Sequence, residues 1–140
     1  MIKKFANNKL FTIFVLQTTR VRPHKNLKKM KQLVKAIMKI AQENPDGFTI
    51  EILTLTTIEK GYVSAYKETQ DSFGIKGLEK VIEHAQSHDK IVGGWFNEDN
   101  NQFYFDINKI FDNLEEAIEF GIQNEQIAIF DLNELRVIKI

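Results

Sequence analysis

The chain has 140 residues, of which 43% are hydrophobic, and it carries 11 Phe but only 2 Pro. This is the composition of a folded globular protein, long enough for one domain with its own core, so intrinsic disorder is excluded. The absence of cysteine excludes disulfides, thiolate nucleophiles and cysteine-ligated zinc or iron–sulfur centres.

The formal net charge of zero is the cancellation of two oppositely charged parts. Residues 1–45 contain eleven basic residues and a single acid, Glu43, whereas residues 46–140 contain eight basic and 18 acidic residues. The two parts therefore carry net charges of +10 and −10. A segment as basic as the first repels itself unless it meets an acidic surface or an anionic partner, so the asymmetry favours a binding function.

In chain order, the first predicted element is a buried strand at residues 10–17, where Phe, Ile and Val are frequent. This run is too short for a signal peptide, and no stretch approaches the roughly 20 apolar residues of a membrane span. We therefore expect a soluble, intracellular (cytoplasmic) protein with no membrane partner. A polar, basic loop at residues 18–25 follows, and Asn26 is expected to cap a helix over residues 27–43.

The rest of the chain is predicted to alternate strand pairs with helices. Residues 48–56 alternate between apolar and polar side chains, and residues 62–66 are expected to return beside them as a hairpin partner. Two further pairs are predicted, at 90–96 with 102–107 and at 127–132 with 135–140. Apolar residues at helical spacing predict one helix after Gly74 and another after Asp112.

The order β-α-β-β-α-β-β-α-β-β predicts an α+β fold: a single domain over residues 1–140, with helices on one face of an antiparallel or mixed sheet of about seven strands. Residues 1–45 would form a basic β-α unit, and residues 46–140 an acidic part built from hairpin–helix units. The similarity between residues 78–85 and 114–121 is compatible with an internal repeat, and equally with a coincidence between two amphipathic helices.

The first candidate binding surface is the basic loop and helix edge near the N-terminus. Its lysines are spaced so that they fall within one narrow arc of the predicted helix. Such an edge can contact phosphates without sequence-specific geometry. Alternatively, it lies across the acidic part of the same chain, or the acidic part itself imitates nucleic acid toward another protein. The residues of this edge are Arg20, Arg22, Lys25, Lys28, Lys31, Lys35 and Lys39.

The second candidate is a small cleft beside Trp95. Paired glycines within a strand, as in residues 93–94, mark a bulge or a close approach of two backbones. If such a bulge lies beside the loop before the second helix, the indole would form one wall of the cleft. The interpretation that we favour is that the bulge lets Trp95 pack into the core under a helix. The cleft residues would be Gln70, Asp71, Gly93, Gly94, Trp95 and Tyr104.

No catalytic or metal-binding pattern is recognisable. His84 and His88 are four residues apart on a predicted helix, but zinc would need at least one more ligand. Asp71, Ser72 and Asp106 stand in no spacing that is typical of an active site. We therefore expect no metal, no cofactor and no enzymatic activity.

Residues 91–132 carry the segments IVGGWFN, FYFD, LEEAI and EQIAIFDL, and residues 69–74 read TQDSFG. In these segments the chain resembles small, largely uncharacterised proteins carried by phages and mobile elements of gut anaerobes. The resemblance covers about residues 47–132 and implies no catalytic residue. It implies an accessory gene of a mobile element, a class that often encodes binders blocking host or rival defence proteins.

These observations together predict a non-enzymatic accessory protein that binds a host protein or a nucleoprotein complex, for example as an inhibitor of a defence system. The alternative is a nucleic-acid-binding protein that uses the basic N-terminal loop and helix.

Overall fold

The computed structural model describes residues 23–140, so the strand predicted at residues 10–17 and the basic residues Arg20 and Arg22 lie outside the described residues. The chain divides into two compact units, Met1–Leu33 and Val34–Ile140. Within residues 23–140, no helix combines the length and the apolar character that a membrane span requires.

Helix α2 (Pro23–Glu43) ends where the sequence predicted but begins earlier. The prediction of a loop through Lys25 with a helix cap at Asn26 is wrong, because the helix already begins at Pro23. Proline suits the first turn of a helix, since its fixed φ is helical and the N–H that it lacks would have no partner there. Within the second unit, α2 buries Val34, Ile37 and Ala41, which recur at helical spacing.

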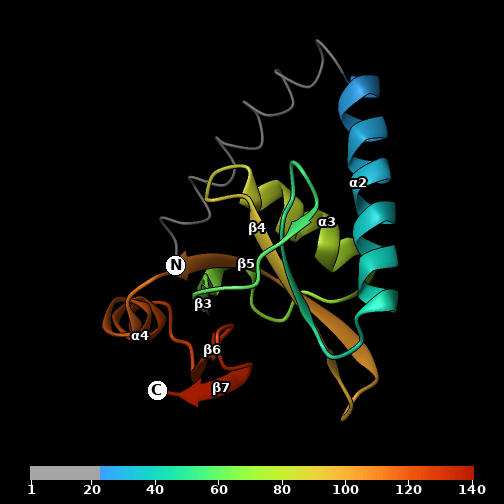
Figure 1. Cartoon of the computed structure of the whole chain (residues 1–140). Helices are drawn as coiled ribbons and strands as arrows, with labels where there is room; N and C mark the ends of the chain where they lie inside the picture. Colours follow the sequence, from blue (N-terminus) through green and yellow to red (C-terminus); the bar gives the residue numbers. More distant parts are fainter. Residues whose placement is uncertain (1–22) are drawn as a thin grey trace, which may run out of the picture. The chain divides into compact units, whose positions relative to one another are not determined.

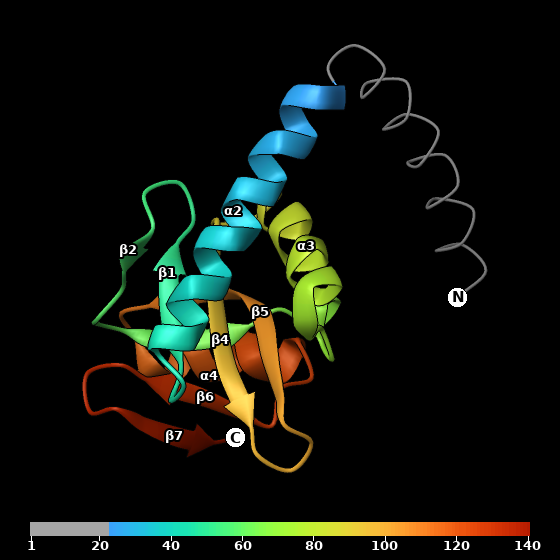
Figure 2. The same cartoon turned by 90° about the vertical axis from the view of Figure 1, so that its right-hand side faces the viewer.

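The described strands form one antiparallel sheet in the order β2-β1-β4-β5-β3-β6-β7 (Figures 1 and 2). The short 3-10 helix η1 (Lys67–Thr69) and helix α3 (Gly74–Ala85) connect β3 to β4, and α4 (Leu114–Gln123) connects β5 to β6. Three α-helices and a seven-stranded sheet within residues 23–140 confirm the predicted α+β class. The strands are β1 (Phe48–Glu51), β2 (Thr56–Thr57), β3 (Tyr62–Ala65), β4 (Ile91–Asn97), β5 (Gln102–Phe111), β6 (Ala128–Asp131) and β7 (Arg136–Lys139).

One face of the sheet, the core face, forms the hydrophobic interior. Alternation along the strands puts Phe105 and Ile107 of β5 on this face, opposite Val92 of β4, and all three side chains are fully buried. Helix α3 packs on β4 and β5 beside residues 34–43 of α2 (Figure 2). Its contribution to the core is made by Leu78, Val81, Ile82 and Ala85.

The hairpin expected between residues 48–56 and 62–66 is wrong. Strand β1 pairs with β2 and β4, whereas β3 lies between β5 and β6. The first strand is cut short after Glu51, because its carboxylate accepts hydrogen bonds from the backbone N–H groups of Leu53 and Thr54, at 3.0 and 2.9 Å, and turns the chain there. The first of the two predicted hairpin–helix units therefore lacks the strand pairing that we expected.

The predicted bulge at the paired glycines is also wrong, because β4 pairs with β5 without interruption from Ile91 to Asn97. The glycines instead allow close approaches. A Cβ on Gly94 would lie 2.5 Å from the ring of Phe48 and 2.6 Å from the ring of Phe103. A Cβ on Gly93 would overlap a neighbouring side chain of β5. The regular alternation of side chains therefore continues through residue 95.

Candidate functional site

Trp95 lies on the protein surface, so the prediction that it belongs to the core is wrong. Its side chain is 45% exposed. The reason is the uninterrupted alternation of β4: Gly94 and Phe96 share the core face, and the residue between them must point to the opposite face. On that opposite face, the cross-strand neighbour of Trp95 is Tyr104 of β5.

Three aromatic rings form a continuous platform on this face. The ring of Tyr104 stacks on that of Trp95, with centroids 5.2 Å apart and planes 26° apart. On its other side it meets the ring of Phe73, at a centroid distance of 5.5 Å. Phe73 is 47% exposed and comes from the loop before α3, where its backbone bridges to that of Tyr104. The hydroxyl of Tyr104 accepts a hydrogen bond from the Asn100 amide at 2.7 Å, which fixes the central ring.

The candidate site also contains two carboxylates, those of Asp106 and Asp71. Asp106 follows Tyr104 by two positions on the same face of β5 and is partly buried, while Asp71 is exposed on the loop before α3. Burial and the neighbouring carboxylate of Asp71 raise the pKa of Asp106 to about 6, although hydrogen bonding with the Trp95 side chain lowers it. We refer to these five residues as the sheet-face cluster: Asp71, Phe73, Trp95, Tyr104 and Asp106.

Neither of these two carboxylates forms an ion pair with a described residue. The ion pairs that residues 23–140 form involve Lys39, His84, His88 and Arg136, and none of them reaches Asp71 or Asp106. The cluster therefore combines exposed aromatic surface with two carboxylates that form no ion pair with a described residue.

Helix η1 and the following loop, which carries Asp71 and Phe73, are hydrogen-bonded to the edge of β5. The buried Thr69 hydroxyl accepts from the backbone N–H of Ile107 at 3.0 Å. Further along, the backbone N–H of Phe105 donates to the carbonyl of residue 72 at 2.8 Å. These bonds satisfy backbone groups of β5 and hold the loop beside the platform. In this loop Asp71 lies close enough to Asp106 for the two charges to interact, Phe73 contacts Tyr104, and Gln70 is exposed.

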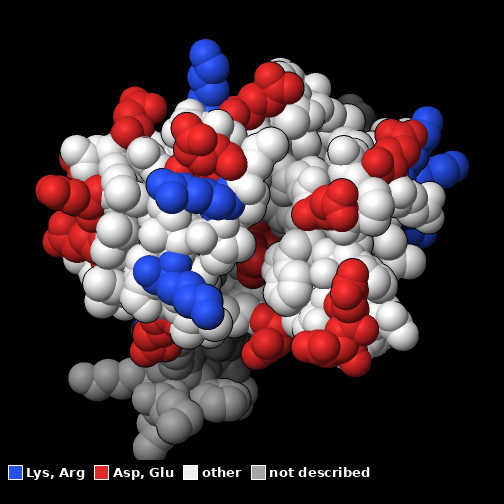
Figure 3. All heavy atoms as spheres, turned by 60° about the horizontal axis from the view of Figure 1, so that its bottom comes forward, with Lys and Arg blue, Asp and Glu red and all other residues white. Residues whose placement is uncertain are grey.

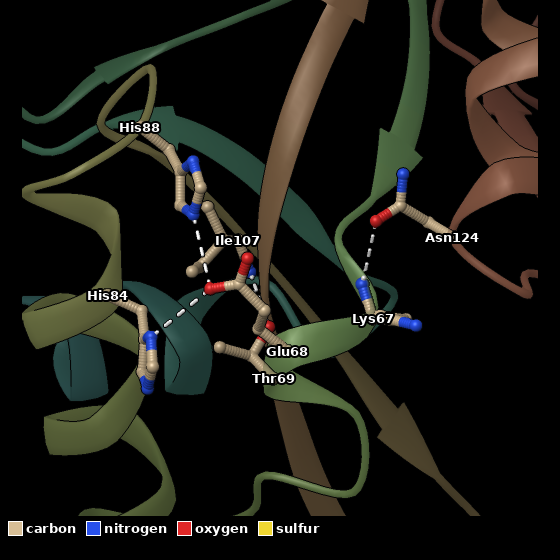
Figure 4. Close-up of polar contacts among 7 residues, drawn as sticks. All are labelled: Lys67, Glu68, Thr69, His84, His88, Ile107 and Asn124. Atoms are coloured by element: carbon tan, nitrogen blue, oxygen red, sulfur yellow. Dashed lines mark hydrogen bonds and ion pairs between the residues drawn. The ribbon is translucent and has the colours of Figure 1, made fainter. Parts of the chain in front are cut away.

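A second anchor of this loop is Glu68, which lies between two histidines (Figure 4). Its Oε2 atom is 3.3 Å from Nδ1 of His84 and 3.2 Å from Nε2 of His88. The contact with His88 is a hydrogen bond, and the contact with His84 is at ion-pair distance, so one carboxylate oxygen ties η1 to the last turn of α3 and to the turn that follows it. Among residues 23–140, no group of three or more His, Cys, Asp or Glu side chains is placed to hold a metal ion.

Ser72 was considered above among the residues that could build an active site. It is buried beside Gly77. Its hydroxyl has no hydrogen-bond partner among the described residues. A hydroxyl in this position is not presented to a substrate in solvent.

The lysines predicted as the basic surface are exposed along α2 where their side chains are described. Lys39 lies 4.0 Å from Glu43, a contact between two exposed side chains that contributes little stability. Arg20, Arg22 and the side chain of Lys25 lie outside the described residues. The exposed lysines, called the lysine row below, are Lys28, Lys31, Lys35 and Lys39.

Acidic side chains also extend beyond the cluster. Figure 3 shows a face of the molecule on which Asp and Glu side chains are spread widely and Lys and Arg are few, with acidic atoms also inside a furrow. This distribution follows from the net charge of −10 on residues 46–140 and favours the approach of basic partners.

Phe73 and Asp106 complete the cluster but were not part of the predicted cleft. For Asp106 a signal was present, because strand alternation places it on the same side as Tyr104. For Phe73 no local signal existed, since its contact with β5 depends on how the loop folds back.

Comparison with known proteins finds no relative: no family model, no curated protein and no solved structure matches the chain. The function is therefore inferred from the surfaces of this chain.

Proposed function

We propose that this protein is a non-enzymatic binding protein that docks on another protein through the sheet-face cluster. The observation that carries the proposal is the platform of Phe73, Tyr104 and Trp95, whose outer two members are 47% and 45% exposed. Aromatic side chains dominate the energetics of interfaces, because each buries a large area with few rotatable bonds. Adjacent exposed rings, rimmed by polar groups, are typical of a surface that is covered by a partner.

The geometry of the cluster favours docking without rearrangement. Regular pairing of β4 with β5 fixes Trp95 and Tyr104, and hydrogen bonds to β5 fix the loop that carries Phe73. A surface that is already in its bound arrangement loses less conformational entropy on association.

The partner that we propose is a host protein or a nucleoprotein complex, with inhibition of a defence system as the consequence of binding. The resemblance of residues 91–132 to proteins of phages and mobile elements supports this context. The large negative charge of residues 46–140 supports a partner with a basic surface.

Affinity capture with the tagged full chain tests the proposal. We expect a specific partner to be captured from a host lysate by the wild type and lost with Trp95→Ser. The matched control is Ile127→Ala, which trims an 85% exposed apolar side chain near β6, outside the cluster, and should capture as well as the wild type. Equal capture by Trp95→Ser, or recovery of the protein alone together with turnover of a nucleotide or peptide substrate, contradicts the proposal.

The second candidate function is nucleic-acid binding through the lysine row, and the exposure of all four lysines favours it. If about four to six basic residues contact duplex DNA, log affinity falls with log salt at roughly −0.9 per phosphate contact. A titration whose affinity does not change between low and moderate salt rules out this mode.

A further inference from the structure

The sheet-face cluster has a specific chemical complement, because it combines aromatic faces with carboxylates. The exposed surface of the Trp95 indole carries negative electrostatic potential over its ring, which attracts a guanidinium or an ammonium group. Asp106 and Asp71 lie close enough for one carboxylate to oppose ionisation of the other, and no described cation pairs with either. A positive group bound between them relieves this repulsion.

We propose that the cluster binds an arginine side chain of the partner, with its guanidinium against the exposed surface of the Trp95 indole and hydrogen-bonded to Asp106 and Asp71. This inference rests on the proposed function and adds the chemistry of the group that the partner inserts. Arginine fits better than lysine, because a planar guanidinium both stacks on an aromatic ring and donates a fixed fork of hydrogen bonds to a carboxylate. Phe73 extends the apolar platform against which the methylene stem of the arginine lies.

A peptide titration tests the chemistry directly. Trp95 is the only tryptophan in the chain, so its fluorescence reports on the cluster alone. The probes are a glycine–serine peptide with a central arginine and the same peptide with lysine or with the neutral analogue citrulline. We expect a saturable fluorescence change with arginine, about fivefold weaker binding with lysine, and no saturation with citrulline. Equal binding of the citrulline peptide overturns the cation site, and equal binding of the lysine peptide overturns the choice of a guanidinium.

Two pairs of substitutions separate the site from general attraction by an acidic protein. Asp71→Asn with Asp106→Asn removes the two carboxylates of the cluster, and asparagine tolerates the positive φ of 60° at position 71. Glu79→Gln with Glu119→Gln removes the same charge from exposed positions on α3 and α4. We expect arginine-peptide affinity to fall about tenfold in the first variant and to stay within about twofold in the second. Equal weakening in both variants overturns the proposal.

Partner capture then distinguishes the failure of this inference from the failure of the proposed function. If Trp95→Ser loses the partner while the Asp71→Asn and Asp106→Asn variant keeps it, the arginine site is wrong and the docking surface stands. If Trp95→Ser keeps the partner, the docking surface itself is wrong. Thermal melts by circular dichroism confirm that each variant is folded. Asp71→Asn alone, at an exposed position, repeats the test if the double variant does not fold.

Discussion

The ionised carboxylate of Asp106 is expected to destabilise the folded protein at neutral pH. Its pKa is raised from 3.8 to about 6, so the folded state binds this proton more tightly than the unfolded state does. The loss of stability caused by this ionisation is absent below the unfolded-state pKa of 3.8. It grows as the pH rises between the two pKa values and is complete above about pH 6. At 1.36 kcal/mol for each pKa unit, the difference corresponds to about 3 kcal/mol, and partial exposure to solvent reduces it to about 2 kcal/mol.

Asp106→Asn removes this charge but keeps a side-chain oxygen at the same position. We expect the free energy of unfolding at about pH 7 to exceed that of the wild type by about 2 kcal/mol, and the advantage to disappear near pH 4. Urea unfolding followed by circular dichroism at neutral, intermediate and acidic pH measures the difference. A variant that is less stable than the wild type at neutral pH, or an advantage that is independent of pH, refutes the assignment of the cost to the charge.

Three further outcomes are expected. Trp95→Ala should lower the free energy of unfolding by less than about 1 kcal/mol, against about 3–5 kcal/mol for a core aromatic, and a large drop in the thermal melt would place the indole in the core. Gly94→Ala should cost about 1–3 kcal/mol, because the added Cβ overlaps the rings of Phe48 and Phe103; an unchanged melting temperature contradicts this close approach. Replacing the whole lysine row with glutamine should leave the melting temperature unchanged and remove duplex-DNA affinity measured by fluorescence anisotropy, whereas DNA binding that survives excludes the row as the contact surface.

Local patterns in the sequence were sufficient to predict where most helices and strands lie along the chain. Apolar residues at helical spacing located α3 and α4, and the end of α2 followed from the residues after Glu43. A strand pair was predicted at 90–96 and 102–107 because a hairpin joins neighbouring segments, and the structure has it at Ile91–Asn97 and Gln102–Phe111. The predicted α+β class followed from this order of elements.

The strand partners of β3 could not be found in this way. Residues 62–65 follow β1 and β2 in the chain, and adjacency in sequence suggested a hairpin with them. In the fold they pair with β5 and β6, which lie much further along the chain. Such pairing depends on contacts between distant segments, which no local propensity specifies. Local propensity likewise does not specify that Asp71 lies near Asp106. It also does not specify that Glu68 contacts His84 in α3 and His88 in the turn after α3.

The position of Trp95 shows most clearly what only the tertiary structure decided. The alternation of β4 specified that Val92, Gly94 and Phe96 share one face and that Ile91, Gly93 and Trp95 share the other. Both sets are apolar or glycine, so the sequence of this strand does not specify which set is buried. Pairing with β5 places Val92 beside Ile107, and helix α3 covers the face on which Phe105 and Ile107 lie. Because that face buries the larger continuous apolar surface under the helix, the indole and the ring of Tyr104 are left on the side that faces solvent.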